Sequence, residues 1–85
     1  MPRVLVYTTR VCPYCLAAKE LLRRKGVTFE EIDLTDQPEA RARLREQTGR
    51  ATVPQILIGD LQVGGFDDLQ ALDRRGELDR LIQGA

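Results

Sequence analysis

Apolar and polar positions recur with two different periods along the chain, and these periods predict strands and helices. Residues 3–8 form a nearly continuous apolar run, which is typical of a central strand covered on both faces. After them, apolar residues follow the i, i+3, i+4, i+7, i+8 spacing of an amphipathic helix. These positions are Tyr14, Ala17, Ala18, Leu21 and Leu22. Gly26, preceded by three basic residues, suits the carboxyl end of that helix.

The next stretch predicts a second strand and a more polar helix. Residues 27–34 indicate the strand, whose alternation changes phase midway and leaves its register open. Asp36 is a capping residue, followed closely by a proline and an acid, and opens a helix that runs to about Gln47. The apolar face of this helix contains only Ala40 and Leu44, so we expect it to lie half in solvent.

The last third of the chain predicts a hairpin and two further helices. Residues 55–58 and 61–63 read as strands joined by Gly59-Asp60, a two-residue hairpin turn. A third helix begins near Phe66 and ends at Gly76, and a last short helix follows it.

The order β-α-β-α-β-β-α, followed by that short helix, predicts the α/β class, with a four-stranded mixed β-sheet flanked by helices. The first β-α-β unit forms a parallel pair with a right-handed crossover, and the hairpin adds antiparallel strands. A chain of 85 residues is expected to form a single domain, residues 1–85. Residues 9–12 follow the first strand directly, at the sheet edge where α/β folds usually bind ligands.

The composition of the chain argues against several classes of function. The 13 basic and 13 acidic residues balance, which argues against a general binder of nucleic acid or anionic membranes. No apolar run is long enough to span a bilayer, and no export signal precedes the first strand. A chain without an export signal is expected in the cytoplasm, which is a reducing compartment. There a C-x-x-C pair is more often catalytic or metal-binding than structural. We also expect the protein to be a monomer. The sequence has no histidine, so zinc would find only two soft ligands, and we expect no metal.

The two cysteines lie together in Cys12-Pro13-Tyr14-Cys15, where the first helix begins. Cys12 suits the N-cap, and Pro13 suits the first turn. A Cys12 thiolate there meets unpaired backbone N–H groups and the positive end of the helix dipole, so we predict a pKa below that of a free thiol. Cys15 lies on the side leading to the core and should be less exposed. The pair reads as an attacking and a resolving thiol; the alternatives are two small buried hydrophobic residues or half a metal site.

Three blocks give the chain a resemblance, over essentially its whole length, to the small dithiol glutaredoxins of bacteria. They are Cys12-Pro13-Tyr14-Cys15, Thr52-Val53-Pro54, and Gly64-Gly65 followed by Asp67-Asp68. The resemblance implies a thioredoxin fold and a glutathione-dependent thiol–disulfide oxidoreductase that reduces protein disulfides and glutathione mixed disulfides. Cys12 and Cys15 would be the catalytic residues and form the redox-active disulfide. Glutathione would be the co-substrate, glutathione reductase would act through it, and reductases such as ribonucleotide reductase could receive the electrons.

The resemblance also implies a glutathione site. A cis Val53-Pro54 bond would turn the Val53 backbone toward Cys12, where it could pair with the cysteinyl backbone of glutathione. The start of the third helix would bind the γ-glutamyl carboxylate. Asp67 is the preferred partner of the γ-glutamyl ammonium. Arg41 matches a position that contacts the glycine carboxylate in relatives. The full predicted set is Arg10, Tyr14, Arg41, Thr52, Val53, Pro54, Gly65, Phe66, Asp67 and Asp68.

Several of these positions keep a second interpretation. Tyr14 either exposes its ring beside the sulfur or packs in the helix stripe. Phe66, often Ser or Cys in relatives, contributes either its backbone N–H alone or a ring that covers the groove. Thr9 replaces a frequent lysine, whose charge Arg10 could supply. Asp67 and Asp68 could simply cap the helix, and Arg41 could belong to a solvated helix face. Pro54 could be an ordinary proline at a strand start.

Two other functions also fit a C-x-x-C redoxin. One is a non-catalytic metal or iron–sulfur carrier. In relatives, such a carrier is a homodimer that holds one cluster between its protomers through the first cysteine and two glutathiones. The other is a redoxin reduced by a flavin-dependent thioredoxin reductase. The proline after Cys12 disfavours the first, and Tyr14 together with the acidic pair Asp67-Asp68 disfavours the second.

Overall fold

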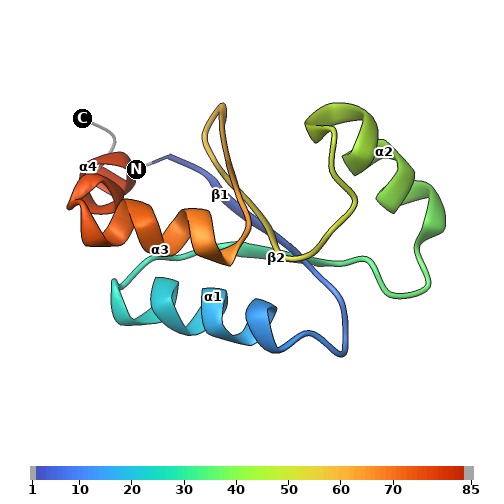
Figure 1. The fold of residues 1–85 in the computed structure, drawn as a ribbon, viewed down its shortest axis with the longest axis horizontal. Helices are drawn as coiled ribbons and strands as arrows, with labels where there is room; N and C mark the ends of the chain where they lie inside the picture. The colour runs from blue at the N-terminus through green and yellow to red at the C-terminus, as the bar shows by residue number, and fades with distance from the viewer. Residues whose placement is uncertain (1, 84–85) are drawn as a thin grey trace.

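The computed structural model describes residues 2–83, so residues 1, 84 and 85 of the predicted domain lie outside it. The elements, in order, are β1 (Val4–Thr8), α1 (Pro13–Arg24), β2 (Glu30–Asp33), α2 (Pro38–Thr48), β3 (Gln55–Ile58), β4 (Leu61–Gly64), α3 (Phe66–Arg74) and α4 (Glu77–Gln83) (Figure 1). The predicted order is confirmed. Within residues 2–83, no helix combines the length and the apolar character needed to cross a membrane.

The strands form one mixed sheet in the order β2-β1-β3-β4. β1 pairs in parallel with β2, and Val6 lies opposite Glu31. On its other edge β1 pairs antiparallel with β3, where Val6 lies opposite Ile56. The hairpin of β3 and β4 completes the sheet, with an irregularity between Ile56 and Leu57. The first strand is therefore central, as its continuous apolar run predicts.

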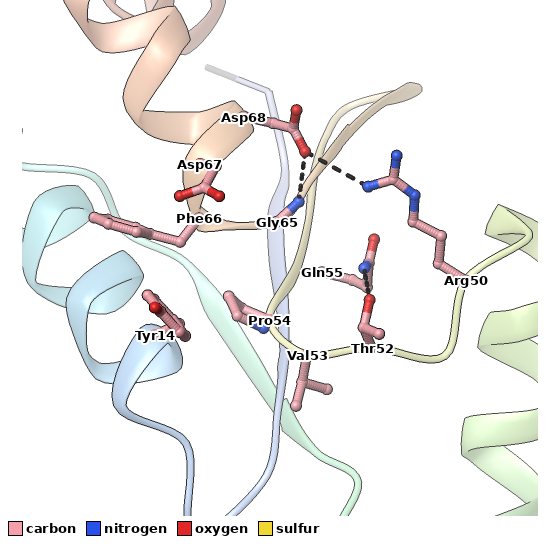
Figure 2. Close-up of a pocket in the computed structure, with 10 residues that line it drawn as sticks. All are labelled: Tyr14, Arg50, Thr52, Val53, Pro54, Gln55, Gly65, Phe66, Asp67 and Asp68. Carbon is pink, nitrogen blue, oxygen red and sulfur yellow. Dashed lines mark hydrogen bonds and ion pairs between the residues drawn. The ribbon is translucent and has the colours of Figure 1, made fainter.

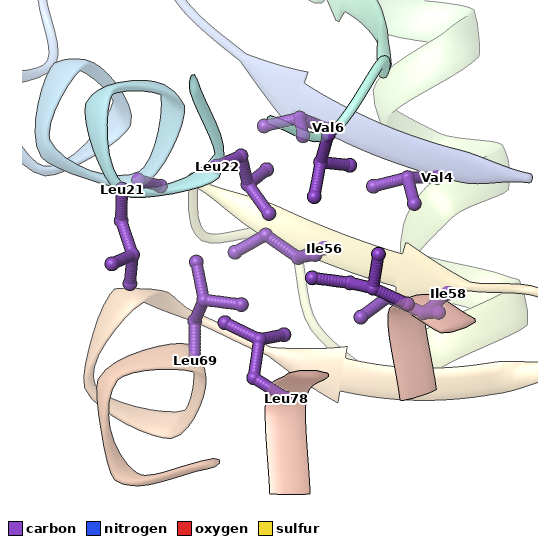
Figure 3. Close-up of a cluster of buried hydrophobic side chains, with 11 residues drawn as sticks. Val4, Val6, Leu21, Leu22, Ile56, Ile58, Leu69 and Leu78 are labelled. Carbon is purple, nitrogen blue, oxygen red and sulfur yellow. The ribbon is translucent and has the colours of Figure 1, made fainter. Parts of the chain in front are cut away.

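A single apolar cluster joins the sheet to α1, α3 and α4 (Figure 3). Its buried members are Val4, Val6, Ala18, Leu21, Leu22, Val27, Ile56, Ile58, Leu69, Leu78 and Ile82. The strand members alternate along β1 and β3 because successive side chains point to opposite faces. Burial of an aliphatic side chain of this size stabilises the fold by about 1.5–3 kcal/mol. This cluster therefore fixes α1 and α3, whose first turns form the site.

An ion pair network joins the end of α1 to α3 and α4. The Lys25 ammonium lies 2.7 Å from Asp73 Oδ1 and 3.3 Å from Asp79 Oδ1. The hydrogen bond to Asp73, followed by the one to Asp79, raises the pKa of Lys25. Lys25 thus holds together the three helices that the apolar cluster already packs.

By contrast, α2 lies away from this cluster and is mostly exposed (Figure 1). Leu44 is its one buried residue, and it lies outside the cluster. The helix ends at Gly49, whose φ of 76° is left-handed. The prediction that this helix lies half in solvent is confirmed.

Two local predictions are wrong, and one open alternative is decided. The N-cap of α2 is Gln37, without a side-chain cap bond, because Asp36 adopts a φ of 61° and instead pairs with Arg10. The open alternative concerns Tyr14, which is exposed and lies outside the buried stripe of α1; that stripe consists of Cys15, Ala18, Leu21 and Leu22. The strand predicted at 27–34 is shorter, since only the segment beside β1 finds ladder partners.

Candidate active site

Cys12 occupies the N-cap of α1, and Pro13 follows in the first turn, as predicted. The backbone of Cys12 is extended, with φ −154° and ψ 97°, so its sulfur turns back over the helix end. There Cys12 Sγ accepts a hydrogen bond of 3.1 Å from the Cys15 N–H. Cys12 and Cys15 form a disulfide, with Cα atoms 5.2 Å apart. Cys12 is half-buried and Cys15 is 2% exposed, so the predicted difference in access is confirmed.

The loop before β3 approaches this sulfur. The Val53-Pro54 peptide bond is cis, as the resemblance implies. The carbonyl oxygen of Val53 lies 3.8 Å from Cys12 Sγ. Pro54 is buried beneath the loop, whereas Thr52 is exposed. A backbone edge is therefore available directly beside the reactive sulfur.

A pocket of about 220 Å³ opens next to this loop (Figure 2). It is lined by Tyr14, Arg50, Thr52, Val53, Pro54, Gln55, Gly65, Phe66, Asp67 and Asp68. Every residue predicted to bind glutathione is among them, except Arg10 and Arg41. The structure thus brings together segments that lie about 50 residues apart in the sequence.

An aromatic wall closes one side of the pocket. Tyr14 is 63% exposed, and its ring centroid lies 6.3 Å from that of Phe66. Figure 2 shows both rings on the same side, opposite Thr52 and Arg50. Tyr14 therefore exposes its ring, and Phe66 contributes its ring as well as its backbone.

The start of α3 forms the acidic end of the pocket. Asp68 Oδ2 accepts a 3.1 Å hydrogen bond from the Gly65 N–H and lies 3.5 Å from Arg50 Nη1. Asp67 is exposed and lines the pocket, and its carboxylate makes no hydrogen bond or ion pair with another side chain of residues 2–83. Asp68 is thus engaged as a cap, while Asp67 keeps its carboxylate available.

Gly64 makes this arrangement possible. Its φ of 109° is left-handed, and a β-carbon there would lie 2.5 Å from Asp68 Oδ2 and 3.2 Å from Arg50 Nη1. A side chain at this position would therefore displace both charged groups.

The sequence reasoning missed Arg50 and Gln55, which also line the pocket. Gln55 is buried, and its Nε2 donates a 3.1 Å hydrogen bond to Thr52 Oγ1. Its Oε1 has no partner within residues 2–83. Both residues flank the Thr52-Val53-Pro54 block, and this adjacency is the signal that could have found them.

Arg10 and Arg41 lie outside this pocket and line a neighbouring hollow. The Arg10 backbone N–H donates to Thr35 Oγ1 at 2.8 Å, and its guanidinium lies 3.1 Å from Asp36. Arg41 Nε donates to the carbonyl oxygen of Ala51 at 3.1 Å. The guanidinium of Arg10 is therefore paired with a carboxylate, whereas that of Arg41 donates to a neutral carbonyl oxygen.

A polar cluster holds the end of β1 in place. Thr8, which is buried, donates to Glu31 Oε2 at 2.8 Å, and Lys19 Nζ lies 3.0 Å from the same oxygen. Burial alone would raise the pKa of Glu31, but the hydrogen bonds from Thr8 and Lys19 outweigh it, so the pKa lies below its usual 4.5. The cluster ties β1, β2 and α1 together one turn below the cysteines.

No group of three or more metal-binding side chains occurs within the part of the chain that the structure describes.

Comparison with known proteins identifies the family. The glutaredoxin family model matches residues 4–63. The chain is 57% identical to a glutaredoxin of Pseudomonas aeruginosa, with 96% of this chain and 98% of that protein covered. The solution structure of glutaredoxin from Brucella melitensis superposes with a TM-score of 0.86 at 54% identity, covering 96% and 89% of the two chains.

The crystal structure of a buckwheat glutaredoxin–glutathione complex superposes with a TM-score of 0.90 at 30% identity, covering 98% of this chain and 78% of that one. The predicted thioredoxin fold and the predicted resemblance are confirmed. The two cysteines that the structure joins at the start of α1 are accordingly those of a thiol–disulfide oxidoreductase, and the chain belongs to the glutaredoxin family.

Proposed function

We propose that the protein uses glutathione to reduce glutathione mixed disulfides and protein disulfides, with Cys12 as the attacking sulfur. The observation that carries this is the position of Cys12 Sγ between a helix N-terminus and the Val53 carbonyl, at the edge of a pocket with an acidic end. Glutathione has a thiol in its middle, a carboxylate at each end and one ammonium. The pocket, Cys12 at its edge and Arg41 outside it together offer a complementary group at each of these points.

In the first step the Cys12 thiolate attacks the glutathione sulfur of a mixed disulfide. The old S–S bond breaks, the substrate leaves as a thiolate that takes up a proton, and a Cys12–glutathione disulfide forms. The Cys15 N–H that donates to Cys12 Sγ stabilises the thiolate, both before attack and when it leaves.

The second step regenerates Cys12. The thiolate of a second glutathione attacks the sulfur of the bound glutathione, so that glutathione disulfide leaves and carries away the two oxidising equivalents. With a protein disulfide, Cys12 is first joined to the substrate, and the Cys15 sulfur then attacks Cys12 and releases the reduced protein. This step leaves Cys12 and Cys15 joined as a disulfide, the pairing that the structure contains, and two molecules of glutathione then reduce it.

The bound glutathione lies along the pocket. Its cysteinyl backbone pairs with the Val53 backbone as a short added strand, and Thr52 and Pro54 hold that edge in place. Its middle lies against the rings of Tyr14 and Phe66.

The two ends of glutathione meet opposite charges. The N–H groups in the first turn of α3, next to Gly65, bind the γ-glutamyl carboxylate, since the Gly65 N–H itself donates to Asp68. Asp67 binds the ammonium, because Asp68 already accepts from Gly65 and pairs with Arg50. The glycine carboxylate extends toward Arg41, and Arg10 contributes less because Asp36 pairs with it.

The remaining partners follow from this chemistry. Substrates are disulfide-containing or glutathionylated proteins, with reductases such as ribonucleotide reductase among the candidates, and glutathione reductase returns the electrons to glutathione. We assign the activity to a single-domain monomer in the cytoplasm, where reduced glutathione is maintained.

The test is NADPH-coupled turnover of a small glutathione mixed disulfide in the presence of glutathione and glutathione reductase. Wild type and Cys15→Ser should turn over, and Cys12→Ser should not, because only Cys12 is needed for the glutathione route. With a protein disulfide as substrate, Cys15→Ser should lose activity as well. Turnover by Cys12→Ser, or none by wild type, would contradict the proposal.

A further inference from the structure

A second hollow adjoins the pocket on the side of α2. It has a volume of about 610 Å³ and is lined by Arg41, Arg45, Gly49, Arg50, Ala51 and Thr52. We call it the arginine hollow. Its three arginines are all exposed, and its lining, taken from residues 2–83, contains no acidic side chain.

The positive charge of the arginine hollow is only partly compensated. Arg50 lies 3.5 Å from Asp68, which belongs to the neighbouring pocket. Arg41 donates to a neutral carbonyl oxygen, that of Ala51. Arg45 makes no ion pair with any other residue of the described chain, 2–83. An anionic group could therefore reach at least two guanidinium groups with unused hydrogen-bond donors.

The arginine hollow lies close to Cys12 Sγ. Thr52 lines both the hollow and the pocket, and the next residue, Val53, has its carbonyl oxygen 3.8 Å from Cys12 Sγ. Figure 2 shows Thr52 and Arg50 on the side of α2, opposite Tyr14. An extended peptide advances about 3.3–3.6 Å per residue. A side chain two to four residues from a cysteine bound at Cys12 can therefore enter the hollow.

We infer that the arginine hollow is a docking surface for an acidic peptide segment that flanks the reactive cysteine of a protein substrate. This rests on the proposed reduction of protein mixed disulfides at Cys12. Glutathione itself is too short to fill both sites, since it occupies the pocket and ends near Arg41. Arg45 lies one helical turn beyond Arg41, where only a longer substrate reaches.

The overall charge favours a short acidic peptide over a polyanion such as nucleic acid. The 13 basic and 13 acidic residues balance, so no extended field attracts a long chain of phosphates. The arginines instead make one local patch, which matches two or three carboxylates placed close together. The aromatic wall on the other side of Cys12 has no such charge.

The test compares two peptides, each joined to a second copy of itself by a disulfide at a single cysteine, so that attack by Cys12 binds the peptide cysteine. One has aspartates at positions two to four from the cysteine, and the other has asparagines there. The kcat/KM for reduction of the peptide disulfide is measured with wild type, Arg45→Gln and Arg43→Gln. Arg43 is the matched control, because it is an exposed arginine of the same helix that does not line the hollow.

Wild type should prefer the aspartate peptide, mainly through a lower KM. Arg45→Gln should reduce that preference about two- to five-fold, the effect of one exposed charge pair, and Arg43→Gln should retain it. Added salt should weaken the preference of wild type. Equal kcat/KM on both peptides, or the same loss in both variants, would overturn the docking surface. A small glutathione mixed disulfide separates the two hypotheses, because failure of wild type there would remove the proposed function itself.

Discussion

The helices α1 and α2 both follow a strand of the same sheet, yet they differ in almost every physical property. α1 buries Cys15, Ala18, Leu21 and Leu22, whereas α2 buries only Leu44. The region packed by α1, α3 and α4 supplies rigid helix ends, and from these come Cys12 and Asp67. The region around α2 supplies exposed charge. Under the proposed function, the reaction chemistry would depend on the packed region, and the choice of partner would depend on the polar one.

The largest expected effect is on the free energy of unfolding, and it compares one buried leucine from each region. Leu22 is 0% exposed within the apolar cluster, and Leu44 is 1% exposed outside it. Leu22→Ala should lower the free energy of unfolding by about 3–5 kcal/mol, because rigid neighbours on all sides leave a cavity. Leu44→Ala should cost about 2–3 kcal/mol, because an exposed helix can shift toward the gap. Urea denaturation of both variants measures this.

The comparison fails if Leu44→Ala costs as much as Leu22→Ala. The mixed-disulfide turnover of the Leu44→Ala variant provides a second measurement, made below its unfolding transition. Its kcat should stay close to that of wild type, since α2 holds neither cysteine, and any change should fall on the KM for glutathione, because α2 contributes Arg41.

The same division explains what could be predicted from the sequence. Val6, Leu22 and Ile56 are buried, and burial imposes the periodicity that identified their strands and helix. Asp36 and Arg10 are exposed and pair with each other, and no periodic pattern specifies where a long exposed side chain points.

In the pocket, the motif residues were found because the resemblance preserves their type and spacing. Arg50 and Gln55 line the same pocket but lie just outside the motif, so only their adjacency to it could have marked them. The orientation of Tyr14 could not be decided either, because an aromatic residue in a first turn satisfies both the helix stripe and an exposed wall. These failures all concern side chains whose direction depends on tertiary contacts.

A second prediction sharpens the comparison at the start of α3, where two adjacent acids have different roles. Asp67→Asn should raise the KM for glutathione about ten-fold, because a charge-assisted hydrogen bond to the ammonium is lost. Asp68→Asn should raise it far less but should lower the free energy of unfolding by about 0.5–1 kcal/mol, because the Gly65 N–H loses its carboxylate acceptor. Coupled turnover and urea denaturation give the two values.

Reactivity of reduced Cys12 with a neutral alkylating agent is the control for this pair. Neither change should alter it much, since both carboxylates act on the far end of the pocket. If Asp67→Asn slows alkylation as strongly as it weakens glutathione binding, the aspartate is structural. The start of α3 would then contribute to folding and not to the binding of glutathione.

The smallest expected effect concerns a polar contact at the border of the packed region. Glu31 accepts hydrogen bonds from Thr8 and Lys19, and its pKa lies below 4.5 because these bonds outweigh the opposing effect of burial. The folded state therefore favours the charged form, and its contribution is fully present above the unfolded pKa. It is lost as the pH falls through the lower, folded-state pKa. At pH 7, Glu31→Gln should cost less than about 1 kcal/mol, because the carboxylate is partly exposed.

The pH dependence makes this small effect measurable. The stability difference between wild type and Glu31→Gln should stay constant from about pH 7 to 5 and close below about pH 4.5, as Glu31 of wild type takes up its proton. Glu20→Gln is the matched control, because Glu20 is an exposed glutamate of α1 with no hydrogen bond to another side chain of residues 2–83, so its difference should be small at every pH. If the stability difference between wild type and Glu31→Gln persists at pH 3, the carboxyl group acts through its shape and not through its charge. The end of β1 would then be held by packing alone, as the rest of that region is.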